Sequence, residues 1–155
     1  MIRVMFVCYG NICRSPMAEF LFKYKIKQLN IEDEFSVSSS ATSYEEIGSR
    51  VHRGTREVLD RLNIDYSQKR AVRLKRKDYD NYDYILVMDE GNLRDAVNIM
   101  GGDPLGKIKM LLQYTDNPRG VADPWYTHNF EATFDDITKG IDGFLNYLRK
   151  KGDIK

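Results

Sequence analysis

The sequence predicts an α/β fold in which a central four-stranded parallel sheet carries helices on both faces. Two observations predict it. Four short apolar runs, typical of buried strands, alternate with longer segments whose apolar residues recur at helical spacing. The first apolar run also ends directly at a turn-rich loop, behind which a helical pattern begins. Strands that alternate with helices imply right-handed crossovers, which place helices on both faces of a parallel sheet.

The expected strands come from the apolar runs, and the helices from apolar positions three and four residues apart. In the first helix, Pro16 is tolerated in the opening turn and Ser15 can cap it. The expected strands are Ile2–Val7, Phe35–Ser39, Tyr84–Met88 and Lys107–Leu111. The expected helices start at Ser15-Pro16 and cover Val51–Leu62, Asn92–Met100 and Phe134–Arg149.

Three turn-rich stretches separate these elements, at Ser38–Ser49, Gly101–Gly106 and Thr115–Thr127. Ligands of parallel α/β folds bind beyond the carboxyl ends of the strands, so these stretches are candidate rim loops. The sequence contains no internal repeat, low-complexity tract or linker. We therefore expect residues 1–155 to form one domain.

The amino-acid composition limits the classes of protein to which this chain can belong. The chain has 155 residues, of which 42% are apolar and 30% charged, and these are globular values. The net charge of +1 argues against an electrostatic footprint for nucleic acid. No apolar stretch approaches the roughly 20 residues that span a bilayer, and no secretory signal is recognisable. We expect a soluble cytoplasmic protein without stable membrane insertion.

The only two cysteines, Cys8 and Cys13, lie close together near the start of the chain. This is no disulfide framework, and the only histidines, His52 and His128, are too far apart in sequence to suggest a metal site. We therefore expect no metal and no organic cofactor. Two thiols in a reducing compartment indicate chemistry more than cross-linking.

The stretch "VCYGNICRSP", residues 7 to 16, is the candidate site. A loop that closes on a helix N-terminus can turn successive backbone amides inward as an anion-binding nest. Gly10 is free to take positive φ there, and Asn11 tolerates it. The planar fork of Arg14 suits two oxygens of a tetrahedral anion. The residues expected to bind phosphate are Tyr9, Gly10, Asn11, Ile12, Cys13, Arg14 and Ser15.

Cys8 is the candidate nucleophile of this loop. The field of the amides and of Arg14 favours its thiolate at neutral pH, placed for in-line attack on phosphorus. Ser15 would donate a hydrogen bond to the sulfur and ease its departure. A Cys-x5-Arg pattern alone occurs by chance in many proteins, and a buried structural cysteine is the competing interpretation.

Phosphoryl transfer to a thiolate also needs an acid for the leaving oxygen. The candidate is Asp123 in "VADPWYTHNF", where Pro124 stiffens the loop. Trp125 and Tyr126 offer a flat wall for a ring-bearing substrate and would partly desolvate the carboxyl group, favouring its protonated form. A turn with two half-buried aromatics is the competing interpretation.

Taken together, these residues resemble the low-molecular-weight protein tyrosine phosphatases. "VCYGNICRSPMAE" agrees with the family's phosphate loop almost letter for letter, and "SSSATS", "DYILVMDEGNLRD" and "ADPWY" follow in the family's order. The resemblance implies a Rossmann-like fold and a two-step reaction on phosphotyrosine proteins. Cys8 would form a phosphocysteine, Arg14 would bind the phosphoryl oxygens, and Asp123 would act first as acid and then as base.

The resemblance also implies supporting roles. Asn11 would be the family's strained loop asparagine, held by hydrogen bonds that include Ser15 and Ser39. Cys13 would pair reversibly with the nucleophile and protect it from irreversible oxidation, or else be a small buried filler. Asp89 would order the site by polar contacts, with a plain helix cap as the alternative.

The chain departs from the family pattern at several positions. Lys69 stands where animal members carry a histidine. The resemblance therefore does not identify the residue that completes the hydrogen-bond network of the loop. Trp125 replaces a more usual tyrosine, and Tyr126 is a candidate for regulatory phosphorylation or for packing in the wall. Across the cleft, the nearest ring would be Tyr44. The expected substrate wall is therefore Ile12, Tyr44, Trp125 and Tyr126.

Three alternatives remain beside the tyrosine phosphatase. An arginine phosphatase of the same fold usually has threonine at the position of Ile12, whose apolar bulk suits a phenyl ring better. A thioredoxin-coupled arsenate reductase needs further cysteines, and none follows Cys13. A non-catalytic phosphate-binding module would have no use for a thiolate or an acid, although "KRAVRLKRK", residues 69 to 77, could meet an acidic partner or membrane headgroups. The apolar rim of the site and this basic stretch leave room for a weak homodimer, which nothing in the sequence requires.

Overall fold

The computed structural model describes all 155 residues, arranged around a four-stranded sheet in the order β2-β1-β3-β4. All three strand pairs are parallel, with Cys8 at the end of β1 opposite Ala41 of β2. The predicted α/β class is confirmed. The strands are β1 Ile2–Cys8, β2 Phe35–Ala41, β3 Tyr84–Val87 and β4 Ile108–Met110.

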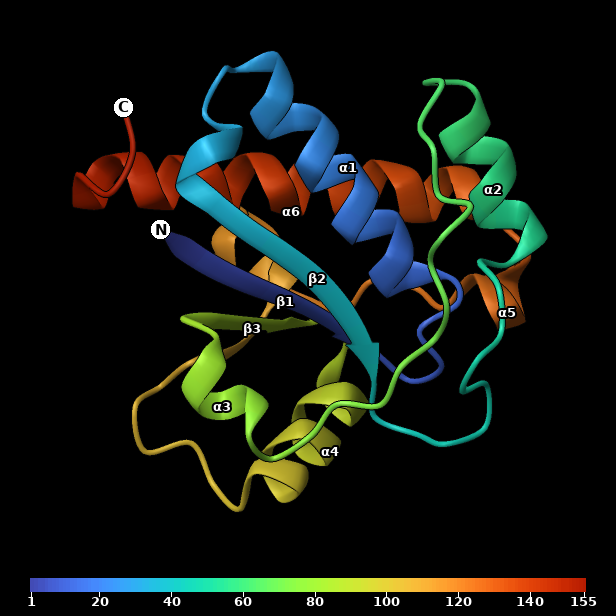
Figure 1. Cartoon of the computed structure of the whole chain (residues 1–155), viewed down its shortest axis with the longest axis horizontal. Coiled ribbons are helices and arrows are strands. Elements are labelled where there is room, and N and C mark those ends of the chain that lie inside the picture. The colour runs from blue at the N-terminus through green and yellow to red at the C-terminus, as the bar shows by residue number, and fades with distance from the viewer.

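Helices cover both faces of this sheet, as Figure 1 shows. α1 and α6 lie on one face, and α3 and α4 lie on the other. The helices are α1 Arg14–Gln28, α2 Arg53–Asp60, α3 Asp78–Asn81, α4 Glu90–Met100, α5 Pro124–Thr127 and α6 Phe130–Lys151. Short 3₁₀ helices occupy Glu32–Glu34 and Leu111–Tyr114.

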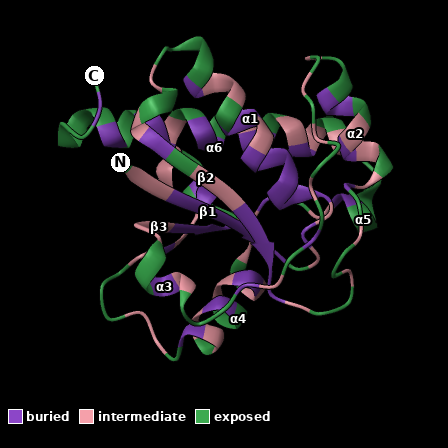
Figure 2. Cartoon of the chain, viewed as in Figure 1, coloured by how far each residue is buried: buried purple, intermediate pink, exposed green.

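The side chains of β1 explain how the two layers are held. Val4, Phe6 and Cys8 join the apolar core beneath α1 and α6, whereas Met5 and Val7 join the core beneath α4. A strand sends successive side chains to opposite faces, so a continuous apolar run supplies both cores. Figure 2 shows this buried layer through the centre of the molecule.

Several local predictions were wrong. Ser15 does not cap α1, which begins at Arg14 without any side-chain cap, because the Ser15 hydroxyl is bonded elsewhere in the site. The expected rim loop Ser38–Ser49 starts too early, since β2 continues to Ala41 by pairing with β1. The helices α3 and α5 were not predicted, and each has only one turn, too short for a visible apolar period.

The carboxyl ends of β1 and β3 open onto the same edge of the sheet. Cys8 lies at the end of β1, and Asp89 follows shortly after β3 as the residue before α4. The fold therefore brings these two segments together at the edge where parallel α/β proteins bind ligands. None of the helices combines the length and the apolar character that a bilayer span requires.

Candidate active site

The loop between β1 and α1 curls around the sulfur of Cys8. Asn11 takes the left-handed backbone conformation, with φ of 58°, and its amide donates to Cys8 Sγ at 3.3 Å. Of the two residues at which the sequence allowed positive φ, Gly10 and Asn11, only Asn11 adopts it. A Cβ at Gly10 would lie 3.5 Å from Cγ of Glu46, which is an ordinary van der Waals contact.

Four successive amides of this loop are free. The backbone N–H groups of Ile12, Cys13, Arg14 and Ser15 donate to no acceptor within the chain. They surround the start of α1, where the helix dipole adds partial positive charge. Such a set of convergent donors is an anion-binding site, and a phosphoryl group has the charge and oxygens to satisfy it.

The Cys8 side chain is buried at the base of this loop, and the residue is only 3% exposed. Ser15 Oγ lies within hydrogen-bond distance of Cys8 Sγ, at 3.0 Å. Both cysteines are free thiols. Burial first, and then the negative charges of Cys8 and Asp123, raise the pKa of Cys13 to about 12, so its thiol stays protonated at neutral pH.

Arg14 reaches from the start of α1 across to two acidic residues. Its Nη1 donates to Asp89 Oδ2 and to the Val121 carbonyl, both at 2.8 Å, and its Nη2 lies 3.4 Å from Asp123 Oδ2. Burial alone would lower the pKa of the Arg14 guanidinium, but the charges of Cys8, Asp123 and Asp89 outweigh it and raise that pKa. The fork is therefore a permanent charge held in one orientation.

Asp89 plays both of the roles that the sequence left open. Its Oδ1 accepts from the Asn92 amide at 2.8 Å and caps α4, while its Oδ2 holds Arg14. One carboxylate therefore ties the start of α4 to the guanidinium.

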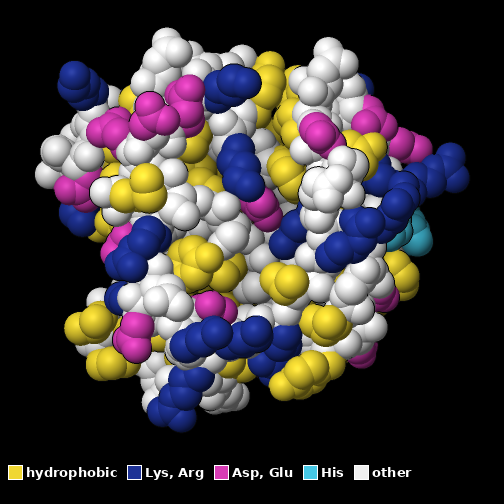
Figure 3. Space-filling view, in the orientation of Figure 1, with side chains coloured by type: hydrophobic (Ala, Val, Ile, Leu, Met, Phe, Trp, Pro, Cys, Tyr) yellow, Lys and Arg dark blue, Asp and Glu magenta, His cyan; other side chains and the backbone are white.

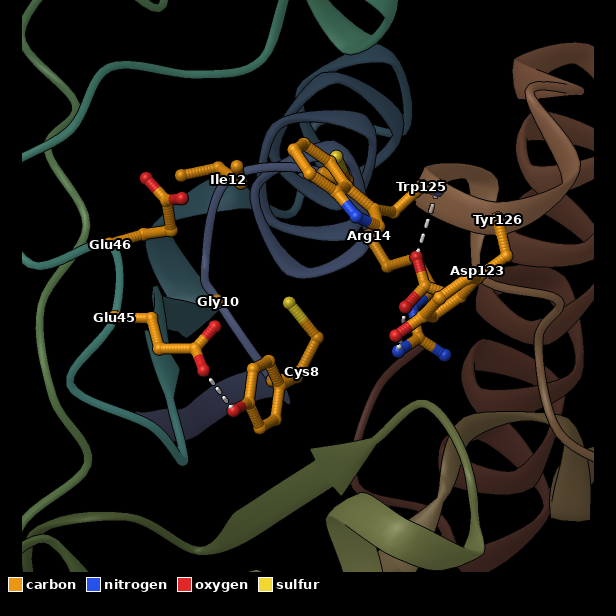
Figure 4. Close-up of a pocket in the computed structure, with 11 residues that line it drawn as sticks. Cys8, Gly10, Ile12, Arg14, Glu45, Glu46, Asp123, Trp125 and Tyr126 are labelled. Carbon is orange, nitrogen blue, oxygen red and sulfur yellow. Dashed lines mark hydrogen bonds and ion pairs between the residues drawn. The ribbon is translucent and has the colours of Figure 1, made fainter.

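Asp123 caps the single-turn helix α5. Its Oδ1 accepts from the Trp125 amide at 3.0 Å, which leaves Oδ2 toward Arg14. The Asp123 side chain is 27% exposed, at the edge of the site rather than at its floor. Figure 4 shows the carboxylate beside Arg14, on the opposite side of the opening from Gly10.

Asn11 is the centre of a hydrogen-bond network beneath the loop. Its Nδ2 donates to Ser15 Oγ at 2.7 Å and to Ser39 Oγ at 2.9 Å, and its Oδ1 accepts from the Val72 amide at 3.1 Å. Both hydrogens of its side-chain amide and one of the two lone pairs of its oxygen are thus engaged. These bonds hold Asn11 in its left-handed conformation and set Ser15 against Cys8.

The network continues to a buried ion pair. Ser39 Oγ donates to Glu19 Oε1 at 2.6 Å, and Glu19 Oε2 accepts from Lys23 at 2.6 Å. Lys69 Nζ donates to the Ser39 carbonyl at 2.9 Å and lies 3.7 Å from Glu19 Oε1. Burial lowers the pKa of Lys69, and the Glu19 carboxylate opposes that shift. Lys69 is therefore the last partner of the network.

A cavity of about 130 Å³ opens above the loop. Figure 4 shows the Cys8 sulfur pointing into it, with Glu45 and Glu46 on one side and Asp123, Trp125 and Tyr126 on the other. It is lined by Cys8, Tyr9, Gly10, Ile12, Cys13, Arg14, Glu45, Glu46, Asp123, Trp125 and Tyr126.

The family of the chain follows from comparison with known proteins. The sequence model of the family "low molecular weight phosphotyrosine protein phosphatase" matches residues 3–154. The chain belongs to this family. It is 34% identical over 156 aligned residues to the low molecular weight protein-tyrosine-phosphatase PtpA of Staphylococcus aureus, covering 100% of this chain and 99% of PtpA.

Two solved structures agree with this membership in the low molecular weight phosphatase family. YfkJ from Bacillus subtilis superimposes with a TM-score of 0.93 at 36% identity, covering 97% of this chain and 96% of YfkJ. SP-PTP, a low molecular weight protein tyrosine phosphatase from Streptococcus pyogenes, gives a TM-score of 0.85 at 36% identity, covering 96% and 93%.

One residue that the sequence placed in the substrate wall of this phosphatase site lies elsewhere in the structure. Tyr44 does not line the cavity: it is 73% exposed, and its ring lies against the Arg73 guanidinium at 4.2 Å. Its neighbours Glu45 and Glu46 take its place at the rim. The turn after β2 directs both carboxylates toward the cavity. The sequence alone does not reveal the direction in which side chains of a turn point.

Sequence reasoning also missed Glu19, which is only 5% exposed. A signal existed, because Glu19 closes the quoted stretch "VCYGNICRSPMAE" and lies one helical turn after Ser15. In α1 this spacing puts Glu19 on the buried side that meets Ser39.

Proposed function

We propose that this chain hydrolyses phosphotyrosine in proteins, and small aryl phosphates, through a phosphocysteine intermediate. One observation carries the proposal: four free amides and the Arg14 fork converge on the space above Cys8. Membership in the family and the PtpA relative support tyrosine as the residue that bears the phosphate. The proposed substrates are phosphotyrosine proteins, and the two free thiols support a cytoplasmic location.

In the first step the Cys8 thiolate attacks phosphorus, so the Sγ–P bond forms as the ester P–O bond breaks. The free amides of residues 12–15 and Arg14 hold the equatorial oxygens, where negative charge is concentrated. Asp123, whose carboxyl group lies at the edge of this space, carries a proton in the enzyme–substrate complex. Asp123 then gives that proton to the leaving phenolate.

In the second step a water molecule attacks the phosphocysteine. Asp123, now a carboxylate, takes the proton of that water, and the S–P bond breaks to release phosphate and the Cys8 thiolate. Ser15 Oγ, at 3.0 Å from the sulfur, stabilises the thiolate as it leaves. The hydrogen-bond network of Asn11 holds Ser15 in place and so positions its hydroxyl group for both steps.

Asp123→Ala tests the acid. We expect turnover of phenyl phosphate to fall by roughly 10²–10⁴-fold, the usual contribution of general acid catalysis. The loss should shrink for aryl phosphates whose phenols are stronger acids, because these leave without a proton. Rates measured across such a series check this prediction. Asp135→Ala is the control, because Asp135 is exposed on α6 and makes no ion pair. A wild-type rate for Asp123→Ala on phenyl phosphate would show that another group is the acid.

An arginine phosphatase is the second candidate, because Glu45 and Glu46 bring carboxylates to the rim and neither is in an ion pair. A guanidinium would be attracted by them. The apolar Ile12 and the exposed rings of Trp125 and Tyr126 instead suit a phenyl group. We expect kcat/KM to be larger for a phosphotyrosine peptide than for the matching phosphoarginine peptide, and the reverse order would favour the second candidate.

The same carboxylates predict a charge preference around phosphotyrosine. Glu45 accepts from the Tyr9 hydroxyl at 2.7 Å, and Glu46 accepts from Ser49 at 2.9 Å, so both are held at the rim. Glu45→Gln/Glu46→Gln should reduce the preference for peptides with Lys or Arg beside phosphotyrosine by roughly two- to fivefold in kcat/KM, as exposed charge pairs do. Glu32→Gln, far from the rim in the 3₁₀ helix before β2, is the control. An unchanged preference would show that the two carboxylates do not contribute to substrate selection.

A further inference from the structure

A second cavity, separate from the phosphatase site, lies between α2 and the turn that follows it. Its volume is about 230 Å³. Four of the seven lining residues are cationic, and none is acidic. The lining is Arg50, Val51, Arg56, Tyr66, Ser67, Lys69 and Arg70.

The arginines of this cavity are not paired with any carboxylate of the chain, although Nη1 of Arg70 donates to the Ser67 and Lys69 carbonyls. Arg50, Arg56 and Arg70 take part in none of the ion pairs of the molecule. The nearby carboxylates are already engaged: Asp60 accepts from the Tyr66 hydroxyl, and Asp65 accepts from Ser67. Figure 3 shows Lys and Arg side chains gathered on this face beside α2.

We propose that this cavity binds the di- or triphosphate group of a small molecule. Guanidinium groups match phosphate oxygens in geometry, and three unpaired arginines around one cavity match the charge of a diphosphate. The volume falls below the roughly 300–1,000 Å³ of pockets for drug-sized ligands, which fits a phosphate chain rather than a whole large ligand. The Tyr66 ring adds an apolar surface on which the base of a nucleotide can lie.

Lys69 couples this cavity to the catalytic loop. It lines the cavity and also donates to the Ser39 carbonyl, while Ser39 Oγ accepts from Asn11. A second link runs along the chain, because the His52 amide, next to Val51, donates to the Ile12 carbonyl at 2.8 Å. A bound polyanion attracts the Lys69 ammonium group away from Ser39 and loosens the support of Asn11. Occupancy should therefore lower kcat.

Binding is tested by titrating ¹⁵N-labelled wild-type protein with pyrophosphate, ADP or adenosine. Amides of residues 50–51 and 66–70 report the second cavity, and amides 12–15 report the catalytic loop separately. We expect pyrophosphate and ADP to shift the first group saturably and adenosine to leave it unchanged. Equal affinities for pyrophosphate and ADP mean that the phosphate chain alone is recognised. Tighter binding of ADP means that the base also contributes to binding. No saturable shift of the first group with pyrophosphate or ADP would overturn the proposal.

Arg56→Gln should weaken this binding by about tenfold, the value of one charge-assisted hydrogen bond. Arg53→Gln is the matched control on the same helix, since Arg53 pairs with Glu57 and does not line the cavity. Equal affinity in the two variants would contradict the assignment.

The coupling to the catalytic loop is tested by kinetics and rests on the proposed phosphatase activity. Pyrophosphate should inhibit wild type in a mixed pattern with reduced kcat, and inhibit Arg56→Gln competitively only. Purely competitive inhibition of both would overturn the coupling. If the chain did not hydrolyse phosphotyrosine, the amide shifts would still show whether the cavity binds, so the two failures are distinguishable.

Discussion

Replacing Cys8 by serine should abolish hydrolysis of p-nitrophenyl phosphate, a loss of about 10⁶-fold when other nucleophile replacements are the guide. A serine hydroxyl is not ionised at neutral pH, and no base lies against this position to activate it, since the neighbours of Cys8 Sγ are the Asn11 amide and the Ser15 hydroxyl. The cradle itself consists of backbone amides and Arg14, which the substitution leaves in place. Burst kinetics and steady-state rates measure the loss.

Binding separates a missing nucleophile from a damaged loop. Cys8→Ser should still bind inorganic phosphate in calorimetry, with an affinity near that of wild type. Cys13→Ser is the matched thiol control and should cost far less activity, because burial keeps the Cys13 thiol protonated and unreactive. Substantial turnover by Cys8→Ser would exclude the phosphocysteine route.

Replacing Arg14 by alanine should lower kcat by roughly 10³–10⁵-fold, the effect of arginines that stabilise a transferring phosphoryl group. The guanidinium is 3% exposed and fixed by Asp89 and Val121, so little reorganisation is needed when charge moves onto the phosphoryl oxygens. Unlike Cys8→Ser, this variant should also lose most of its affinity for inorganic phosphate. Steady-state kinetics and phosphate calorimetry on the same preparation measure both effects.

Arg14→Lys keeps the charge but not the fork, and should recover only part of the activity. Arg3→Ala is the control for losing an ion-paired arginine, because Arg3 pairs with Asp83 at the opposite end of β1. Circular dichroism must show that Arg14→Ala is folded, since Asp89 and Asp123 lose their partner. A folded Arg14→Ala with wild-type phosphate affinity would contradict the role assigned to the guanidinium.

Local sequence determined the parts of the molecule that depend on neighbours in the chain. The run Ile2–Val7 is apolar at every position but one, which is the pattern of a strand buried on both faces. The stretch from Cys8 to Arg14 closes onto its own helix, so the loop, the nucleophile and the fork could be placed together before any tertiary contact was known. The resemblance to the phosphatase family, and not the local sequence, implied that Asn11 is strained, and it has φ of 58°.

Long-range packing decided the rest. Asp123 meets Arg14 across 109 residues of chain, and Lys69 meets Ser39 across 30. No periodicity or motif spacing records the direction in which such side chains turn. This is why Tyr44 was expected in the wall and instead stacks on Arg73, and why the carboxylates of Glu45 and Glu46 went unnoticed.

The sequence by itself determined the strand–loop–helix unit and its chemistry, because amide direction and helix dipole follow from a few adjacent residues. Only the tertiary structure decided which acids and cations surround that unit. Their positions depend on how β2, α5 and the turn after α2 pack at the sheet edge, and a one-residue change in a turn is enough to reverse a side chain.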